Sequence, residues 1–369
     1  MADAGQTTDD ARLRARVATL MGAFRDAGGV EVSAPVLLPA EALLDLYGED
    51  IRGRAYVTSD ALRGEQMLRP DFTVPVVQRH MAEGAEPARY AYAGPVFRKQ
   101  EQDPSRANEY PQVGYEVFAR SAPAETDAEV FALIAAQLDG LPVRAVTGDI
   151  GILMAAVRGL ETTDRRRTAL MRHIWRPRRF RALLDRFAGR TPVPASRARL
   201  LAEDHPWTGA APQIGLRGRA EVEARIAALR EDAAEPPLAA EALALLDALL
   251  AVRETCDFAI ERLRDLSVDL VSIRPAVDRL AARLDALDAR GFAPGSLEFE
   301  ANYGRTSMEY YDGFVFGFYA TRRPDWPPVA TGGRYDALTE RLGQGAGAIP
   351  AVGGVVRPDL VVALDGAGT

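Results

Sequence analysis

Apolar and polar residues follow two different periods along this chain, and the period changes from region to region. Residues 10–27 carry apolar side chains at helical spacing and predict an amphipathic helix that ends at a glycine pair. Residues 89–98 and 110–118 alternate like strands around a polar loop and predict an antiparallel hairpin. A helix over 125–138 and a strand over 143–147 are predicted to follow. Shorter elements fill the gap after the first helix: strands over 30–38, 54–57 and 66–69, and helices over 39–47 and 72–81.

The middle of the chain has a different pattern. Residues 162–266 are rich in Ala, Leu, Arg and Glu at helical spacing, with breaks near 189–194, 205–218 and 235–237, and they predict a helical insertion. The β pattern then returns. The predicted elements are strands over 268–271, 297–301 and 310–319, a helix over 276–290, a glycine pair followed by a helix within 329–342, and an apolar segment over 351–364.

These patterns predict an α+β protein in which one core is interrupted by the insertion. We expect residues 1–161 to form the first part of the core, 162–266 the helical insertion and 267–369 the second part. The length of 369 residues agrees with two domains, or with one large domain that carries an insertion.

Composition narrows the class of protein. Apolar residues make up 47% of the chain, which is enough for a large core without disulfides. The net charge of −7 argues against a nucleic-acid partner, although a local basic patch remains open. The single cysteine, Cys256, excludes an internal disulfide and favours a reducing, cytoplasmic setting. With three scattered histidines it supplies no metal-ligand cluster, so we predict no metal and no cofactor. The polar N-terminus and the lack of long apolar runs predict neither a signal peptide nor a membrane partner.

Four segments stand out by their chemistry. They are LRPDFT (68–73), AYAGPVFRKQEQDPSRANEYPQVGYE (91–116), EYYDGFVF (309–316) and TGGRYD (331–336). The second resembles motif 2 of class II aminoacyl-tRNA synthetases, in the form found in histidyl-tRNA synthetases. The first resembles the segment that holds the α-amino group there, and the last two resemble the two histidine motifs. The segments occur in the family's order. The resemblance implies the class II aminoacyl-tRNA synthetase catalytic-core fold, an antiparallel sheet flanked by helices, with a helical insertion.

The residue types in these segments suit a free histidine, which offers a cationic amine, a carboxylate and an imidazole. The amine needs an acceptor such as Asp71, helped by Thr73. The carboxylate needs arginine or amide donors, for which Arg98, Gln112 and Arg305 are candidates. The ring needs an acid and hydroxyl groups; the candidates are Glu116, Tyr310, Tyr311 and Tyr335. The resemblance implies the same positions for histidine binding.

Each candidate also has a purely structural interpretation. Asp71 is a possible helix cap, and Gln112 and Glu116, four residues apart on one strand, are compatible with a solvated strand face. Tyr310 and Tyr311 are compatible with ordinary strand aromatics, and the glycine pair in TGGRYD with a simple turn. Their joint occurrence, rather than any one of them, predicts a pocket.

The departures from the family pattern concern ATP. Leu360 falls where the resemblance places the ATP-binding arginine of motif 3, and Gln100 replaces the acid that usually follows the motif 2 arginine. Arg305 precedes Glu309 by four residues, whereas the family has a spacing of three. The chain ends at Thr369, where synthetases continue with an anticodon-binding domain, so we expect no such domain. These features predict that no catalytic residue remains.

A synthetase-like core with a lost ATP site resembles the regulatory subunits of ATP phosphoribosyltransferase. The resemblance implies a non-catalytic role in histidine biosynthesis, a self-dimer, and a hetero-octamer of four such chains and four short-form catalytic subunits. It also implies L-histidine as an effector. Two alternatives remain: a truncated ligase that activates an amino acid with ATP, and a stand-alone histidine sensor. The function of the insertion is not indicated by the sequence.

Overall fold

A computed structural model describes residues 2–47, 51–100, 106–208, 212, 214–305, 310–343 and 347–366. Within these residues the core is one nine-stranded sheet, in the order β1-β5-β6-β12-β11-β10-β7-β9-β8. Neighbouring strands are antiparallel except for two parallel pairs, β1 with β5 and β7 with β9. The strands are β1 (Val30–Glu31), β5 (Ala88–Phe97), β6 (Glu109–Phe118), β7 (Val143–Asp149), β8 (Arg253–Thr255), β9 (Glu298–Glu300), β10 (Phe314–Ala320), β11 (Ala330–Arg334) and β12 (Ala351–Val356). The predicted α+β fold with a mainly antiparallel sheet is confirmed.

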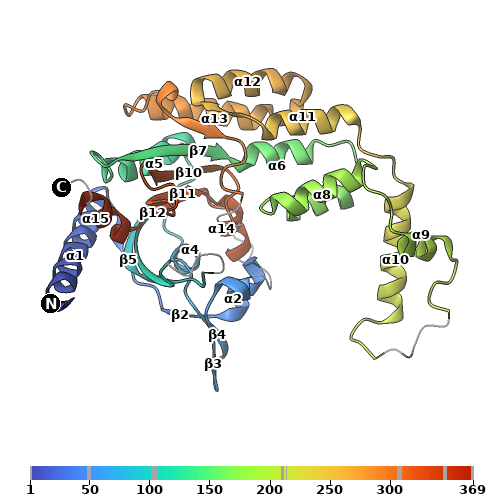
Figure 1. Cartoon of the computed structure of the whole chain (residues 1–369), viewed down its shortest axis with the longest axis horizontal. Coiled ribbons are helices and arrows are strands. Elements are labelled where there is room, and N and C mark those ends of the chain that lie inside the picture. The colour runs from blue at the N-terminus through green and yellow to red at the C-terminus, as the bar shows by residue number, and fades with distance from the viewer. Residues whose placement is uncertain are drawn as a thin grey trace.

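Helices cover this sheet and its ends (Figure 1). At one end α1 (Ala2–Asp26) lies against α15 (Pro358–Gly366) and contacts β5 and β6. The helix α5 (Pro123–Ala136) packs on β6, β11 and β12, and α13 (Arg274–Asp288) packs on α5. Beyond it lies α12 (Cys256–Asp269), followed by a short 3-10 turn, Val271–Ile273. Two further helices, α4 (Thr73–Glu83) and α14 (Asp336–Leu342), contact each other.

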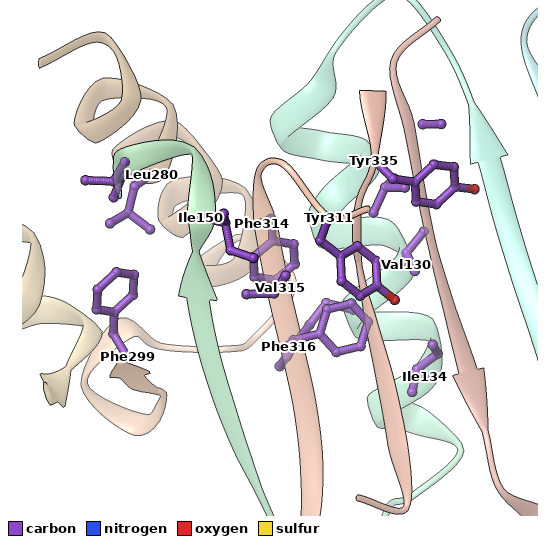
Figure 2. Close-up of a cluster of buried hydrophobic side chains, with 14 of the residues drawn as sticks. Val130, Ile134, Ile150, Leu280, Phe299, Tyr311, Phe314, Val315, Phe316 and Tyr335 are labelled. Atoms are coloured by element: carbon purple, nitrogen blue, oxygen red, sulfur yellow. The ribbon is translucent and has the colours of Figure 1, made fainter. Parts of the chain in front are cut away.

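The core between sheet and helices is rich in aromatic side chains. Figure 2 shows Phe314 and Phe316 of β10 between α5, which carries Val130 and Ile134, and α13, which carries Leu280. All five are nearly inaccessible to solvent. Alternation along β10 turns every second residue to this side, which is why a strand pattern could be recognised there from the sequence.

A small second sheet stands beside the core. It contains β2 (Leu37–Pro39), β4 (Gly64–Leu68) and β3 (Val57–Asp60) in that order, with α2 (Ala40–Tyr47) and α3 (Ile51–Arg54) nearby. The strand predicted over 54–57 is wrong in position, because a helix ends at Arg54 and the strand begins at Val57. The predicted strand over 30–38 is divided between the two sheets, into β1 and β2.

The helices between β7 and β8 extend away from the sheet and are called the helical excursion below. These are α6 (Ile150–Arg158), α7 (Asp164–Arg172), α8 (Pro177–Phe187), α9 (Ala195–Ala202), α10 (Arg219–Ala234) and α11 (Ala240–Leu250). Of these, α9 and α10 lie farthest from the sheet (Figure 1). The buried Arg166 of α7 donates to Asp232 of α10 at 2.7 Å and thereby ties these two helices together.

The strand predicted over 268–271 is wrong. These residues form the end of α12, Leu270 and the start of the 3-10 turn, because buried Leu270 and Ile273 pack among helices rather than beside a strand. A short apolar run does not distinguish a strand from a buried helical segment.

Candidate functional site

A cavity of about 200 Å³ lies where β6, β10, β11 and β12 meet the start of α4. Its volume is below the roughly 300–1,000 Å³ typical of pockets for drug-sized ligands, and it suits a smaller molecule. Eight of the nine predicted site residues line it: Asp71, Thr73, Arg98, Gln112, Glu116, Tyr310, Tyr311 and Tyr335. The structure therefore brings together side chains from four separate sequence segments.

The local structure explains how each segment reaches the cavity. Asp71 and Thr73 lie at the start of α4, while Gln112 and Glu116 project from the same face of β6 because they are four residues apart on a strand. Tyr311 lies just before β10, and buried Tyr335 links β11 to α14. Neither Gln112 nor Glu116 lies on a solvated face, since they are only 4% and 1% exposed.

Glu116 is the most tightly held side chain of the cavity. Its Oε1 accepts hydrogen bonds from the hydroxyls of Tyr92 at 2.8 Å and Thr73 at 3.1 Å. Its Oε2 accepts from the Tyr335 hydroxyl at 2.5 Å. Burial raises the pKa of Glu116 to about 7, although the three hydrogen bonds favour the ionised form and oppose that rise. The carboxyl group is thus fixed in orientation and titrates near neutrality.

Glycines on the facing strands make room for this arrangement. Gly114 lies opposite Tyr92 in the β5–β6 pair, and a Cβ on Gly114 would lie 2.2 Å from the ring carbon Cζ of Tyr92. A side chain at Gly114 would therefore displace the ring whose hydroxyl holds Glu116. Gly332 of β11 and Gly354 of β12 also line the cavity, so backbone rather than side chains forms part of its floor.

Asp71 and Gln112 provide acceptors at the cavity wall. The carboxylate Oδ1 of Asp71 accepts weakly from the backbone N–H of Val74 at 3.5 Å, so its role as a helix cap is minor. The amide oxygen of Gln112 is buried, and no described residue donates to it. A buried acceptor without a donor is costly, and a ligand that donates an N–H to it would remove that cost.

Arg305 is the predicted residue that does not line the cavity. Its Nε donates to the carbonyl of Ile174 at 2.8 Å, and its Nη1 donates to Asn302 at 2.6 Å. Its guanidinium also lies over the ring of Phe180, 4.9 Å from the ring centroid. Burial lowers the pKa of Arg305 to about 10. The side chain is held by the helical excursion, and Glu309, its partner in the predicted spacing, lies outside the described residues.

Several side chains of the site were not predicted from the sequence, among them Tyr92 and Arg357. Tyr92 is a buried strand tyrosine that lies opposite Gly114. This pairing would have indicated its role, but it can be recognised only when the register of β5 and β6 is known. Arg357 lines the cavity and lies 4.0 Å from the Tyr110 ring centroid. It also donates to Asp359 at 2.8 Å. Leu360 does not line the cavity and packs against the core.

The part of the chain that the structure describes holds no group of three or more metal-ligating side chains. None of its helices is both long enough and apolar enough to cross a bilayer.

Comparison with known proteins gives a consistent result. A family model described as "Histidyl-tRNA synthetase" matches residues 6–210 and 218–361. A curated protein of Brucella ovis named "ATP phosphoribosyltransferase regulatory subunit" is 32% identical, over 93% of this chain and 94% of its own length. A protein of the same name from Brucella abortus is similar to the same extent.

Solved structures match the fold at lower identity. An "ATP phosphoribosyltransferase regulatory subunit/histidyl-tRNA synthetase" of Bacillus halodurans has a TM-score of 0.66 at 21% identity and covers 96% of this chain and 79% of that chain. A "Histidine--tRNA ligase subunit" of Alicyclobacillus acidocaldarius has a TM-score of 0.61 at 23% identity, covering 97% and 94%. These structures support the predicted class II synthetase core fold.

Proposed function

This chain belongs to the family of ATP phosphoribosyltransferase regulatory subunits, which share the histidyl-tRNA synthetase fold, and we propose that it controls a short-form catalytic subunit in response to L-histidine. In this proposal the catalytic subunit needs the chain for full activity. Bound histidine shifts the assembly towards a less active state. The catalytic reaction itself takes place on the partner.

The observation that carries this proposal is the set of polar groups in the cavity. A buried carboxyl group at Glu116, held by three hydroxyls, suits the N–H of an imidazole ring. Asp71 supplies an acceptor for the α-amino group, and Gln112 offers the amide oxygen that no described residue satisfies. Arg98, at the same wall, supplies a cation for the α-carboxylate. Together these groups match the three polar parts of free histidine.

Feedback control needs more than binding. Histidine must bind the less active state of the assembly more tightly than the active state, by about 1–3 kcal/mol for a typical allosteric coupling. The two tyrosines before β10 are suited to report occupancy, because they line the cavity and belong to a connecting segment rather than to a strand.

A non-catalytic role agrees with the chemistry around the cavity. Leu360 is partly buried against the core and presents no cation where the synthetase resemblance places one. The side-chain nitrogen of Gln100 donates to the carbonyl of Ala107 at 3.2 Å, so this position supplies no carboxylate. We expect no histidine-dependent exchange between ATP and pyrophosphate. Such exchange would favour the truncated ligase instead.

The proposed assembly is a self-dimer that joins short catalytic subunits into a hetero-octamer of four plus four, located in the cytoplasm. The segment 30–37 supports a self-dimer through exposed apolar side chains. Val30 of β1, at the edge of the large sheet, is 60% exposed, and Val36 and Leu37, where the small sheet begins, are 41% and 48% exposed. Exposed apolar side chains beside an unpaired strand favour association.

Reconstitution tests the proposed function. The purified chain is mixed with a short-form catalytic subunit, and phosphoribosyl transfer to ATP is measured with and without L-histidine. We expect the chain to raise the rate and histidine to lower it. A rate and a histidine response identical to those of the catalytic subunit alone would refute the proposal.

A further inference from the structure

Positive charge is concentrated in one part of this acidic molecule. Residues 164–187, which form α7, α8 and the turn between them, hold nine arginines and two aspartates, a net charge of +7. The whole chain has a net charge of −7, so the remainder carries −14. The helix pair α7–α8 is therefore a basic surface on an otherwise acidic protein.

Most of these arginines pair with an acid or another group, but three have no acidic partner within the described part of the chain. Arg166 is buried against Asp232, Arg181 pairs with Asp185 and Asp247, and Arg186 lies 3.8 Å from Asp232. By contrast, Arg172, Arg178 and Arg179 are exposed and pair with no acid among the described residues. These three, called the arginine triad below, flank the turn that joins α7 to α8.

The same turn is hydrogen-bonded to Tyr311, which lines the cavity, and to Arg305, which lies outside it. The indole Nε1 of Trp175 donates to the carbonyl of Tyr311 at 3.1 Å. In return, Arg305 donates to the carbonyl of Ile174 at 2.8 Å, with its guanidinium over the ring of Phe180. A movement of Tyr311 must therefore either break the Trp175 bond or pull the turn along with it.

From these observations we propose that the α7–α8 pair is a docking surface for the catalytic chain, whose contacting face carries carboxylates that receive the arginine triad. This inference rests on the proposed function and names the surface that carries it out. Arginine suits such a contact because its planar group binds a carboxylate through two parallel hydrogen bonds. Ligand in the cavity reaches this surface through Tyr311 and Trp175.

The charge distribution favours an acidic protein over a nucleic acid as the partner. A nucleic acid presents a phosphate at each nucleotide, so its binding proteins usually carry an extended basic face. Here the arginine excess is limited to residues 164–202, and the rest of the molecule, which is strongly acidic, would repel a long polyanion. A protein partner needs only a local acidic patch.

The test reverses the three charges in the full-length chain. The variant Arg172→Glu/Arg178→Glu/Arg179→Glu is compared with Arg264→Glu/Arg274→Glu/Arg279→Glu, which makes the same change at exposed arginines of α12 and α13. Association with the catalytic subunit is measured by calorimetry at two salt concentrations. We expect the triad variant to associate at least about tenfold more weakly, with a smaller difference at high salt, and the control to associate normally. Histidine binding by the isolated variants should be unchanged, which also shows that they are folded.

Several outcomes separate the possible failures. If the wild-type chain does not associate with the catalytic subunit, both the proposed function and the proposed docking surface are refuted. If the wild type associates and the triad variant associates equally well, the docking surface is refuted and the proposed function stands. If the wild type binds a short RNA duplex and the triad variant does not, the basic surface belongs to a nucleic acid and the inference is also refuted.

The link to the cavity needs its own variant. Trp175→Phe removes the indole N–H but keeps an aromatic ring in its half-buried place. We expect this variant to bind histidine and the catalytic subunit normally, and to require at least about fivefold more histidine for half-inhibition of the assembly. Unchanged inhibition would refute the link through Trp175.

Discussion

Gly353 of β12 lies directly opposite Glu116 of β6, and a Cβ built on Gly353 would come within 1.4 Å of the Glu116 carboxylate oxygen Oε2. No real side chain fits at that distance. A glycine is therefore needed at position 353 to leave room for the Glu116 carboxyl group on the neighbouring strand, and not to form a turn. The apolar segment at the end of the chain thus contributes directly to the site.

Substitution of Gly353 tests this relationship. Gly353→Ala should push the Glu116 carboxylate away from its three hydroxyl donors, weaken histidine binding at least about tenfold, and cost about 1–3 kcal/mol through overpacking. Calorimetry with histidine and urea unfolding measure the two effects. Gly22→Ala is the matched control, because a Cβ at Gly22 in α1 meets nothing within 4 Å. Equal histidine affinity in both variants would contradict the prediction.

The raised pKa of Glu116 gives a pH dependence with a definite sign. Its pKa rises from 4.5 to about 7 on folding, so between these values the folded state holds the extra proton. The associated stability is fully present below pH 4.5 and is lost as the pH rises through about 7. It amounts to about 3 kcal/mol as an order of magnitude.

Urea unfolding of wild type and Glu116→Gln across this pH range isolates that contribution. The stability of the wild type should fall relative to the variant as the pH rises, because the glutamine cannot ionise. Glu261→Gln, at an exposed position of α12, should follow the wild type. Parallel curves for wild type and Glu116→Gln would show that Glu116 titrates normally.

Tyr335 should control the ionisation of Glu116. Its hydroxyl donates to Oε2 at 2.5 Å and favours the carboxylate, so Tyr335→Phe should raise the pKa of Glu116 further. At neutral pH less of the group is then ionised, and histidine binding should weaken. Carbon NMR of the Glu116 carboxyl and calorimetry measure both changes. Tyr90→Phe, which removes a buried hydroxyl hydrogen-bonded to His80 instead, should leave both values unchanged.

The buried ion cluster behind the sheet should matter for stability rather than for ligand binding. Arg283 of α13 donates to Asp127 at 3.2 Å and to Asp149 at 2.6 Å, and all three side chains are buried. Arg283→Met strands the Asp149 carboxylate, leaves Asp127 paired with Arg334 alone, and should cost about 3–5 kcal/mol in urea unfolding. Adding Asp149→Asn should recover part of that loss. If the double variant is no more stable than Arg283→Met, unpaired charge at Asp149 is not the cause.

Much of the site could be predicted because its signals are local in the sequence. Glu116 and Gln112 share a face through strand alternation, and Asp71 and Thr73 lie three residues or fewer from a helix start. The role of Gly353 could not be predicted, since it depends on which strand pairs with β6 and in which register. The orientation of Arg305 could not be predicted either. Its main acceptor, the carbonyl of Ile174, is 131 residues away in the sequence.

The excursion that begins after β7 leaves and rejoins the sheet at one edge. The chain returns as β8, which pairs with β9, and β9 in turn pairs with β7. The chain leaves the sheet at the end of β7 and rejoins it at β8, only two strands away. The length of the helices between them therefore does not affect how the strands of the sheet pair. Helices can be added or removed there over evolutionary time while the framework of the cavity stays intact. The outer helices α9 and α10, which lie farthest from the sheet, can thus change without altering the strands that frame the cavity.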